Sequence, residues 1–173
     1  MIYTLDGVVS KILLTKFSLE KIVHAKRNDV FSIFSNYEQF ERLIPQFFPS
    51  IRIRSVRGDT AVVEEHFHLG EVEFLLMSKH VSKPFVLHEV FVIGGKSKGS
   101  YIRQEFIEIP DGTKILIDVD LKLMGMMKVP KLLDRTKLIE NYSKLVEEEA
   151  NNYKNKDGTQ LSLGSIDESE DIK

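Results

Sequence analysis

Apolar residues alternate with polar ones through the middle of the chain, which is the period of a β-strand. The clearest case is Lys114 to Leu123, where every second residue is aliphatic. Short turn signals separate the neighbouring segments, so adjacent strands are expected to run antiparallel. The predicted strands are Phe17 to Ala25, Ile51 to Val56, Thr60 to Leu69, Glu71 to Val81, Phe85 to Gly94, Ser100 to Ile109 and Lys114 to Leu123.

Helical spacing appears on both sides of this region. Val30, Phe31, Ile33 and Phe34 predict a short helix that ends near Ser35, and a second short helix follows from Asn36 until Pro45. From Pro130 to Tyr153 an apolar stripe recurs at helical spacing, which predicts a long helix that covers an apolar surface. The fold class is therefore α+β, with seven antiparallel strands, two short helices after the first strand and one long C-terminal helix.

Charge is distributed unevenly over the 173 residues. The chain has 24 Lys and Arg against 26 Asp and Glu, a net charge of -2. Residues 154–173 contain three Lys and five acids, so this tail accounts for the whole -2. The tail has no aromatic residue and few aliphatic ones, which predicts disorder. The expected organisation is an N-terminal extension over residues 1–16, one domain over residues 17–153 and an acidic tail over residues 154–173.

Composition excludes several classes of protein. With no cysteine, the chain can form neither disulfides nor thiolate metal sites. It lacks the basic excess typical of nucleic-acid binding, and no apolar run approaches the ~20 residues that span a bilayer. We expect a cytoplasmic protein with no cofactor, no nucleic-acid partner and no integral membrane contact. Lys96 and Lys98 lie in a glycine-rich turn that could touch a membrane surface transiently.

Strand register predicts which side chains face the concave side of the sheet. Taking Asp111 and Gly112 as a turn, we pair Phe106 with Ile117 and Gln104 with Val119. A turn at Ser82 and Lys83 places alternate residues from Phe85 to Ile93 on the same face. The predicted inner face is apolar and aromatic, with a few polar groups: Glu65, Ser78, His80, Glu89 and Gln104.

Two histidines, His66 and His68, share the opposite face of one predicted strand, where His66 is expected opposite Glu73. This spacing occurs in some strand-borne metal sites. Metal ligands normally need a shaped pocket, so a solvated polar face is the favoured interpretation and no metal site is predicted. His24 and His88 are isolated in the sequence and are interpreted as structural.

One segment resembles a known family. Ala25-Lys-Arg-Asn-Asp29-Val30-Phe31, continuing through Tyr37 and Phe40 to Leu43-Ile44-Pro45, is similar to the opening of START-like (SRPBCC, Bet v 1-like) proteins. Within the superfamily it looks most like the polyketide cyclase/dehydrase and coenzyme Q-binding START-type branch. The usual proline after the alanine is Lys26, and the usual aspartate is Asn36. The resemblance implies a helix-grip fold, in which a curved sheet wraps around the long helix and leaves a hydrophobic cavity.

The leading hypothesis is non-catalytic binding of a hydrophobic small molecule of lipid, isoprenoid or quinone type in that cavity. No nucleophile–base arrangement is evident, so no catalytic residue is assigned. The expected cavity residues are Val63, Glu65, Phe67, Phe74, Leu76, Leu87, Glu89, Phe91, Gln104, Phe106, Ile117, Val119, Leu132, Ile139 and Tyr142.

Two alternatives stay open. One is a cyclase or dehydratase that uses Glu65 or Glu89 as a general base. The other is a ribosome-associated or protein-associated interaction module, which the resemblance to ribosome-associated members of the branch allows. An exposed apolar patch around Val86, Val90 and Val92 would support it.

Overall fold

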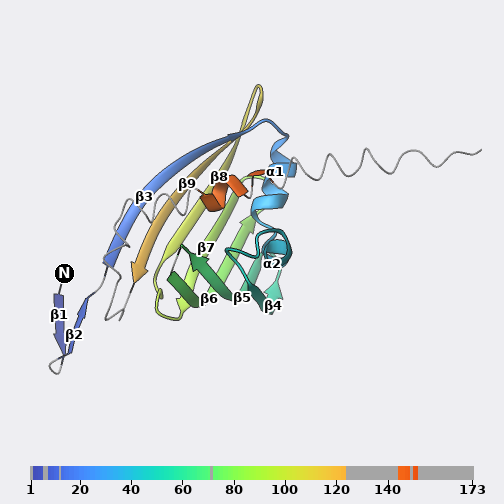
Figure 1. Cartoon of the computed structure of the whole chain (residues 1–173). Helices are drawn as coiled ribbons and strands as arrows, with labels where there is room; N and C mark the ends of the chain where they lie inside the picture. Colours follow the sequence, from blue (N-terminus) through green and yellow to red (C-terminus); the bar gives the residue numbers. More distant parts are fainter. Residues whose placement is uncertain are drawn as a thin grey trace, which may run out of the picture.

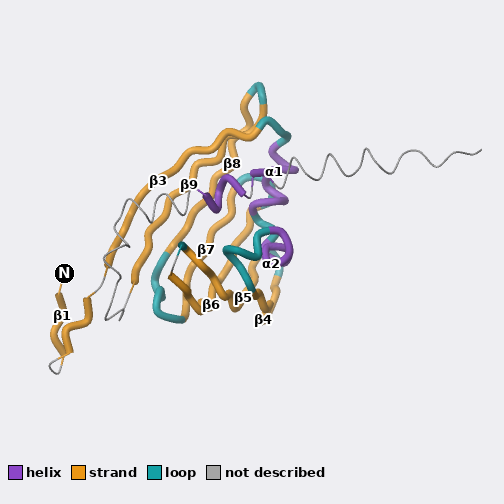
Figure 2. The backbone as a smooth tube through the Cα atoms, in the orientation of Figure 1, coloured by secondary structure: helices purple, strands orange, loops and turns teal. Residues whose placement is uncertain are grey.

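The protein is a curved antiparallel sheet with its helices on the concave side (Figure 1). The computed structural model describes residues 2–5, 8–11, 13–70, 72–123, 144–148 and 150–151. The sheet has seven strands in the order β3-β9-β8-β7-β6-β5-β4 (Figure 2). Their bounds are β3 Leu13–Val23, β4 Ser50–Arg57, β5 Thr60–Leu69, β6 Val72–Lys83, β7 Leu87–Gly94, β8 Tyr101–Ile109 and β9 Gly112–Leu123.

The N-terminal region has more structure than the sequence predicted. Strands β1 (Ile2–Leu5) and β2 (Val8–Lys11) form a separate two-stranded sheet within the predicted extension. Strand β3 begins four residues before the predicted Phe17, because Leu13 to Lys16 pair with the end of β9. Cross-strand hydrogen bonding thus lengthens a strand beyond its clear apolar alternation.

The helices lie where the periodicity predicted them. Helix α1 covers Arg27–Phe34, and the second predicted helix is a 3₁₀ turn, η1 (Tyr37–Gln39), followed by the short helix α2 (Phe40–Leu43). Residues 144–148 and 150–151 are helical and belong to the predicted C-terminal helix. The earlier part of that prediction, from Pro130, lies outside the described residues. The predicted fold class is confirmed.

The core fills the space between the concave face and these helices. The five aliphatic residues predicted to share one face of β9, from Ile115 to Leu123, are all buried. Phe31 and Phe34 of α1 meet Phe106 of β8 edge to face, at centroid distances of 5.1 and 6.0 Å. From the C-terminal helix, Leu145, Val146 and Ala150 are buried in the same core, and Glu147 forms an ion pair with Lys21 of β3.

The turn between β8 and β9 lies one residue earlier than predicted, which shifts the register of the two strands by two residues. Ile109 pairs with Gly112, so the turn residues are Pro110 and Asp111, and Phe106 lies opposite Ile115 rather than Ile117. Proline suits the second position of a type I turn and glycine the fourth. Gly112 has φ 147°, and a Cβ there would lie 2.2 Å from the Val23 carbonyl oxygen. A shift of two residues leaves every side chain on its predicted face.

The turn between β6 and β7 has an odd number of residues where an even number was predicted. This difference has a larger consequence, because it changes which side chains of β7 face the pocket. Lys83 pairs with Leu87, so Pro84, Phe85 and Val86 form a three-residue turn in place of Ser82 and Lys83. An odd turn reverses which alternate residues of β7 face inward. His88 and Val92 are therefore buried, whereas Phe91 and Ile93 are exposed.

Candidate functional site

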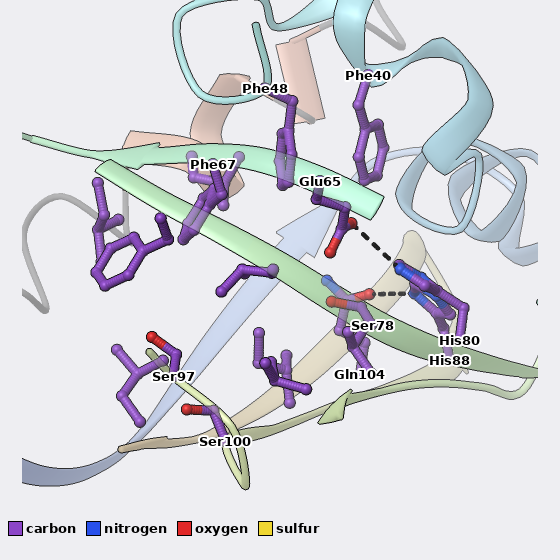
Figure 3. A pocket seen from close by; sticks show the side chains of 18 of the residues that line it. Phe40, Phe48, Glu65, Phe67, Ser78, His80, His88, Ser97, Ser100 and Gln104 are labelled. Carbon is purple, nitrogen blue, oxygen red and sulfur yellow. Dashed lines mark hydrogen bonds and ion pairs between the residues drawn. The ribbon is translucent and has the colours of Figure 1, made fainter. Parts of the chain in front are cut away.

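A pocket of about 70 Å³ lies between the concave face of the sheet and the helices (Figure 3). One wall is aromatic and comes from α1, α2, the segment after α2 and strands β5 and β6: Phe34, Phe40, Phe48, Phe67 and Phe74. Four of these rings pack in succession, from Phe40 through Phe48 and Phe67 to Phe74, with Phe48 and Phe67 stacked at 4.9 Å. Leu145 of the C-terminal helix also lines the pocket.

Polar side chains form a continuous buried chain along one side of the pocket. Each comes from a different strand: Glu65 from β5, His80 from β6, His88 from β7 and Gln104 from β8. His80 Nε2 lies 3.2 Å from Glu65 Oε1, and His80 Nδ1 lies 3.1 Å from His88 Nε2. His88 Nδ1 lies 2.8 Å from Gln104 Oε1. All four side chains are at most 5% exposed.

Burial changes the protonation of one of these four side chains, His88. Burial and, to a smaller extent, the neighbouring His80 lower the pKa of His88 to about 4, against smaller opposing effects of Gln104 and Glu65. His88 is therefore a neutral imidazole at pH 7, with one nitrogen donating and the other accepting. With Gln104 Oε1 as acceptor, His88 Nδ1 donates to it, and His80 Nδ1 donates to His88 Nε2. The contact between His80 Nε2 and Glu65 then requires one proton, carried by either group.

Two serine hydroxyls in the pocket have no hydrogen-bond partner among the described residues. They are Ser78 Oγ on β6 and Ser97 Oγ in the loop after β7, and both are buried. A buried hydroxyl without a partner costs about 1–3 kcal/mol, so such groups usually meet a water or a ligand atom. Figure 3 shows Ser78 beside Gln104 and the two histidines, which gives the pocket a polar end.

Five of the predicted cavity residues line this pocket: Glu65, Phe67, Phe74, Leu76 and Gln104. Four more are buried in the surrounding core without lining it: Val63, Phe106, Ile117 and Val119. Leu132, Ile139 and Tyr142 lie outside the described residues.

The prediction for Leu87, Glu89 and Phe91 was wrong, because the three-residue turn reverses β7. These side chains lie on the convex face, where Glu89 accepts a hydrogen bond from the Tyr101 hydroxyl. The exposed apolar patch that would have supported an interaction module is not formed by these valines, since Val92 is buried and Val90 lines the pocket, although Val86 is 44% exposed.

Sequence reasoning missed His88, which it treated as an isolated structural histidine. Val90, Val92, Ser97 and Ser100 were also absent from the predicted cavity. The length of the β6–β7 turn decides the position of His88, and the sequence does not signal that length. With three turn residues, the alternation in β7 brings His88 to the inner face beside His80.

Metal-binding capacity lies elsewhere in the described part of the chain. There, the one group of three or more His and acidic side chains with converging ligand atoms is His66, His68 and Glu73. The alternating burial along β5 puts His66 and His68 on the face opposite Glu65 and the pocket.

Solved structures with the same fold were found, although no family model and no curated protein matches the chain. The protein TTHA0849 from Thermus thermophilus is 12% identical at a TM-score of 0.69, over 87% of this chain and 99% of that one. A START superfamily protein from Mycobacterium smegmatis is 14% identical at 0.65, over 82% and 97%. The Zhui aromatase/cyclase from Streptomyces sp. R1128 is 11% identical at 0.60, over 90% and 100%.

These similarities show the fold: the chain has the helix-grip fold found in START-like (SRPBCC, Bet v 1-like) proteins, as the sequence predicted. At 11–14% identity they concern the fold, and function has to be argued from the pocket. No helix in the described ranges has the length and apolar character needed to cross a membrane.

Proposed function

We propose that the protein binds a hydrophobic small molecule with one polar end inside this pocket. The observation that carries the proposal is the combination of an aromatic wall with the unpartnered Ser78 hydroxyl and the Glu65–His80 pair at one end. Binding sites for small molecules are commonly apolar concavities with a few converging polar groups. START/Bet v 1-like proteins and an aromatase/cyclase share the fold, which is consistent with this role.

The polar end limits the chemistry of the ligand. Ser78 can donate or accept a hydrogen bond, and the proton between His80 and Glu65 lets that pair do either. A carbonyl or hydroxyl oxygen on an otherwise apolar body satisfies these groups, as in lipids, isoprenoids and quinones. Burial of the apolar body supplies about 25 cal/mol per Å².

The present volume sets a condition on binding. A water occupies about 10–15 Å³ by the same kind of measure, so a pocket of about 70 Å³ holds only a few waters. A ligand of quinone size therefore requires the aromatic side chains to move apart. We expect binding to be accompanied by rearrangement of the wall that Phe48 and Phe67 form.

A matched pair of variants tests the proposal. Val90→Phe fills the pocket, whereas Ile93→Phe puts the same ring on the exposed face of the same strand. Native mass spectrometry after mild extraction should detect a co-purifying apolar molecule in the wild type and in Ile93→Phe but not in Val90→Phe. Absence of any such molecule, together with no saturable binding of an apolar fluorescent probe, would overturn the proposal.

A second candidate is catalysis of proton transfer in the same pocket, as in a cyclase or dehydratase. The buried Glu65–His80 pair, 3.2 Å apart, favours it because such a pair can remove and return a proton. Glu89 is excluded from this role because it lies outside the pocket. Glu65→Gln separates the two functions. If the protein only binds its ligand, neither the wild type nor the variant converts the bound molecule. If it is an enzyme, the wild type converts its substrate, and the variant binds the substrate without converting it.

A further inference from the structure

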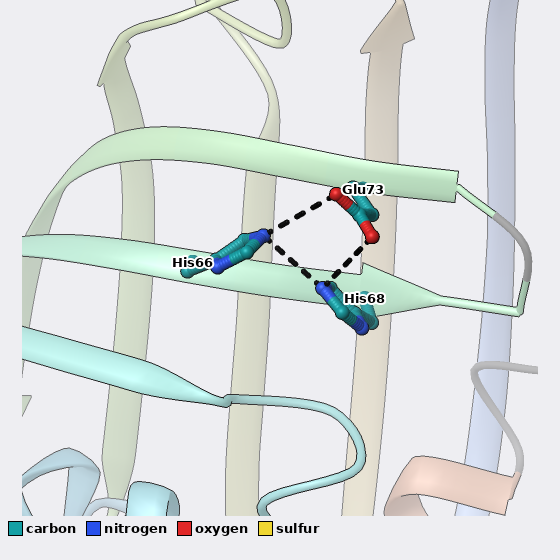
Figure 4. Close-up of side chains that lie close together, drawn as sticks. All are labelled: His66, His68 and Glu73. Carbon is teal, nitrogen blue, oxygen red and sulfur yellow. Dashed lines mark hydrogen bonds and ion pairs between the residues drawn. The ribbon is translucent and has the colours of Figure 1, made fainter.

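Three side chains of types that ligate metals lie close together (Figure 4). The alternating burial along β5 places them on the face of the sheet opposite the pocket. His66 and His68 lie two residues apart on β5, and Glu73 lies on β6 directly opposite His68. The Nε2 atoms of the two histidines are 3.1 Å apart. Glu73 Oε2 lies 3.6 Å from His66 Nε2, and Glu73 Oε1 lies 3.6 Å from His68 Nε2.

We propose that His66, His68 and Glu73 form a binding site for a divalent transition metal, with Zn²⁺ as the best match. Zinc binds nitrogen and oxygen ligands at about 2.0–2.1 Å in a tetrahedral arrangement, which places neighbouring ligand atoms about 3.4 Å apart. The observed separations of 3.1 and 3.6 Å lie on either side of that value. One ion can therefore contact all three side chains after only small rotamer adjustments.

The backbone already holds the ligands in place. Alternation along β5 puts both imidazoles on one face, and the pairing of His68 with Glu73 fixes the carboxylate beside them. Strands β4 and β7 flank β5 and β6 in the sheet, so the ligands stand on a rigid element. Within the described ranges, these three side chains make their hydrogen bonds and ion pairs with one another. No other described group competes for the ligand atoms.

The ligand types select the metal. Two imidazoles and one carboxylate suit zinc and similar divalent ions, whereas magnesium and calcium prefer oxygen ligands alone. The side chains are 32%, 28% and 68% exposed, so water can reach the fourth coordination position. Neither imidazole has a described partner for its other nitrogen, and such outer contacts strengthen a site. We therefore expect weaker binding than at a closed structural zinc site.

Occupancy would join β5 to β6 on the face opposite the pocket. Glu65 and Phe67 alternate with the two histidines on β5, so a metal would hold the strand that carries these pocket residues. The site uses no pocket side chain. It can therefore exist whether or not the pocket binds a ligand.

The test uses full-length untagged protein, because a polyhistidine tag would bind the same ions. After chelator treatment and dialysis, calorimetric titration with Zn²⁺ should show one site per chain, and Mg²⁺ should show none. Co²⁺ should develop the visible absorption of a four-coordinate ion. His66→Gln, His68→Gln and Glu73→Gln should each weaken Zn²⁺ binding at least tenfold, and His24→Gln, which changes an exposed histidine elsewhere, should not.

Thermal unfolding provides the second readout. Zn²⁺ should raise the Tm of the wild type and of His24→Gln, and this shift should vanish in the double variant His66→Gln/His68→Gln. All variants change partly exposed side chains, so their metal-free unfolding should match the wild type. The proposal is overturned if the wild type does not bind Zn²⁺, or if binding persists undiminished in the double variant.

Discussion

The two faces of strands β5 and β6 carry the same kinds of side chain in opposite surroundings. On the concave face Glu65 meets His80 with both at most 3% exposed, and on the convex face Glu73 meets His66 and His68 at the protein surface. The His–carboxylate distances are similar, 3.2 Å inside and 3.6 Å outside. Solvent therefore distinguishes the pairs: buried groups depend on their partners, and exposed groups can exchange a partner for water or a metal.

Removing the buried acid should have the largest effect. Glu65→Ala leaves His80 without its partner in the protein interior, so we expect a loss of about 3 kcal/mol in the free energy of unfolding. The outer counterpart, Glu73→Ala, should change it by no more than about 0.5 kcal/mol, because water replaces the carboxylate. Urea unfolding of both variants measures the difference. Equal losses would show that burial does not separate the two faces.

Lowering the pH should destabilise the folded protein through His88, on the inner face of the sheet. Its pKa is about 4 in the folded protein against 6.5 for an ordinary histidine, because of burial and of His80. Between these two pH values the unfolded chain binds a proton that the folded protein does not. The contribution of His88 to the free energy of unfolding is therefore fully present above pH 6.5 and falls as the pH is lowered towards 4. At pH 5 the loss is about 2 kcal/mol relative to pH 7.

Two histidine variants assign this pH dependence. Between pH 7 and pH 5, the free energy of unfolding of His88→Gln should fall by about 2 kcal/mol less than that of the wild type. His24→Gln, at an exposed histidine, should show the same fall as the wild type. Urea unfolding at the two pH values is the measurement. An unchanged slope in His88→Gln would mean that other groups titrate in this range.

Most of the fold could be predicted from the sequence because alternation and turn positions report local backbone preference. The inward face of β9 and the shared outer face of His66, His68 and Glu73 both follow from period-two alternation. The error at β7 arose at a turn where Phe85 has φ 65°. Bulky residues rarely adopt that conformation, so the sequence carries no signal for a three-residue turn there.

The site was less predictable because it depends on contacts across strands. Glu65, Ser78 and His80 could be placed on the inner face from alternation alone. The contact between His80 and His88 requires the pairing of β6 with β7, which the wrong turn displaced. The 3.1 Å separation between His66 and His68 likewise depends on side-chain rotamers, which a sequence pattern does not specify.

Removing a hydroxyl should have a smaller effect of opposite sign. Ser78 Oγ is buried without a described partner, so Ser78→Ala removes an unsatisfied group and should stabilise the ligand-free protein by about 1 kcal/mol. The same variant should bind the proposed ligand more weakly, since it loses a polar contact. Ser55→Ala, at an exposed serine of β4, should change neither property. Urea unfolding and probe titration test this, and a destabilised Ser78→Ala would indicate a buried water on that hydroxyl.

The smallest effect is expected at Glu64, the direct sequence neighbour of Glu65 on the opposite face. Arg54 Nε donates a hydrogen bond to Glu64 Oε2 over 3.1 Å, and this bond lowers the pKa of the carboxyl. A lowered acid pKa stabilises the folded protein above the unfolded value, and that contribution is lost as the pH falls through the folded value. The pair is exposed and screened by solvent, so Glu64→Gln should cause no measurable change in urea unfolding at pH 7. A loss comparable to that of Glu65→Ala would show that the Arg54–Glu64 pair holds β4 against β5, and burial would then no longer explain the contrast between adjacent glutamates.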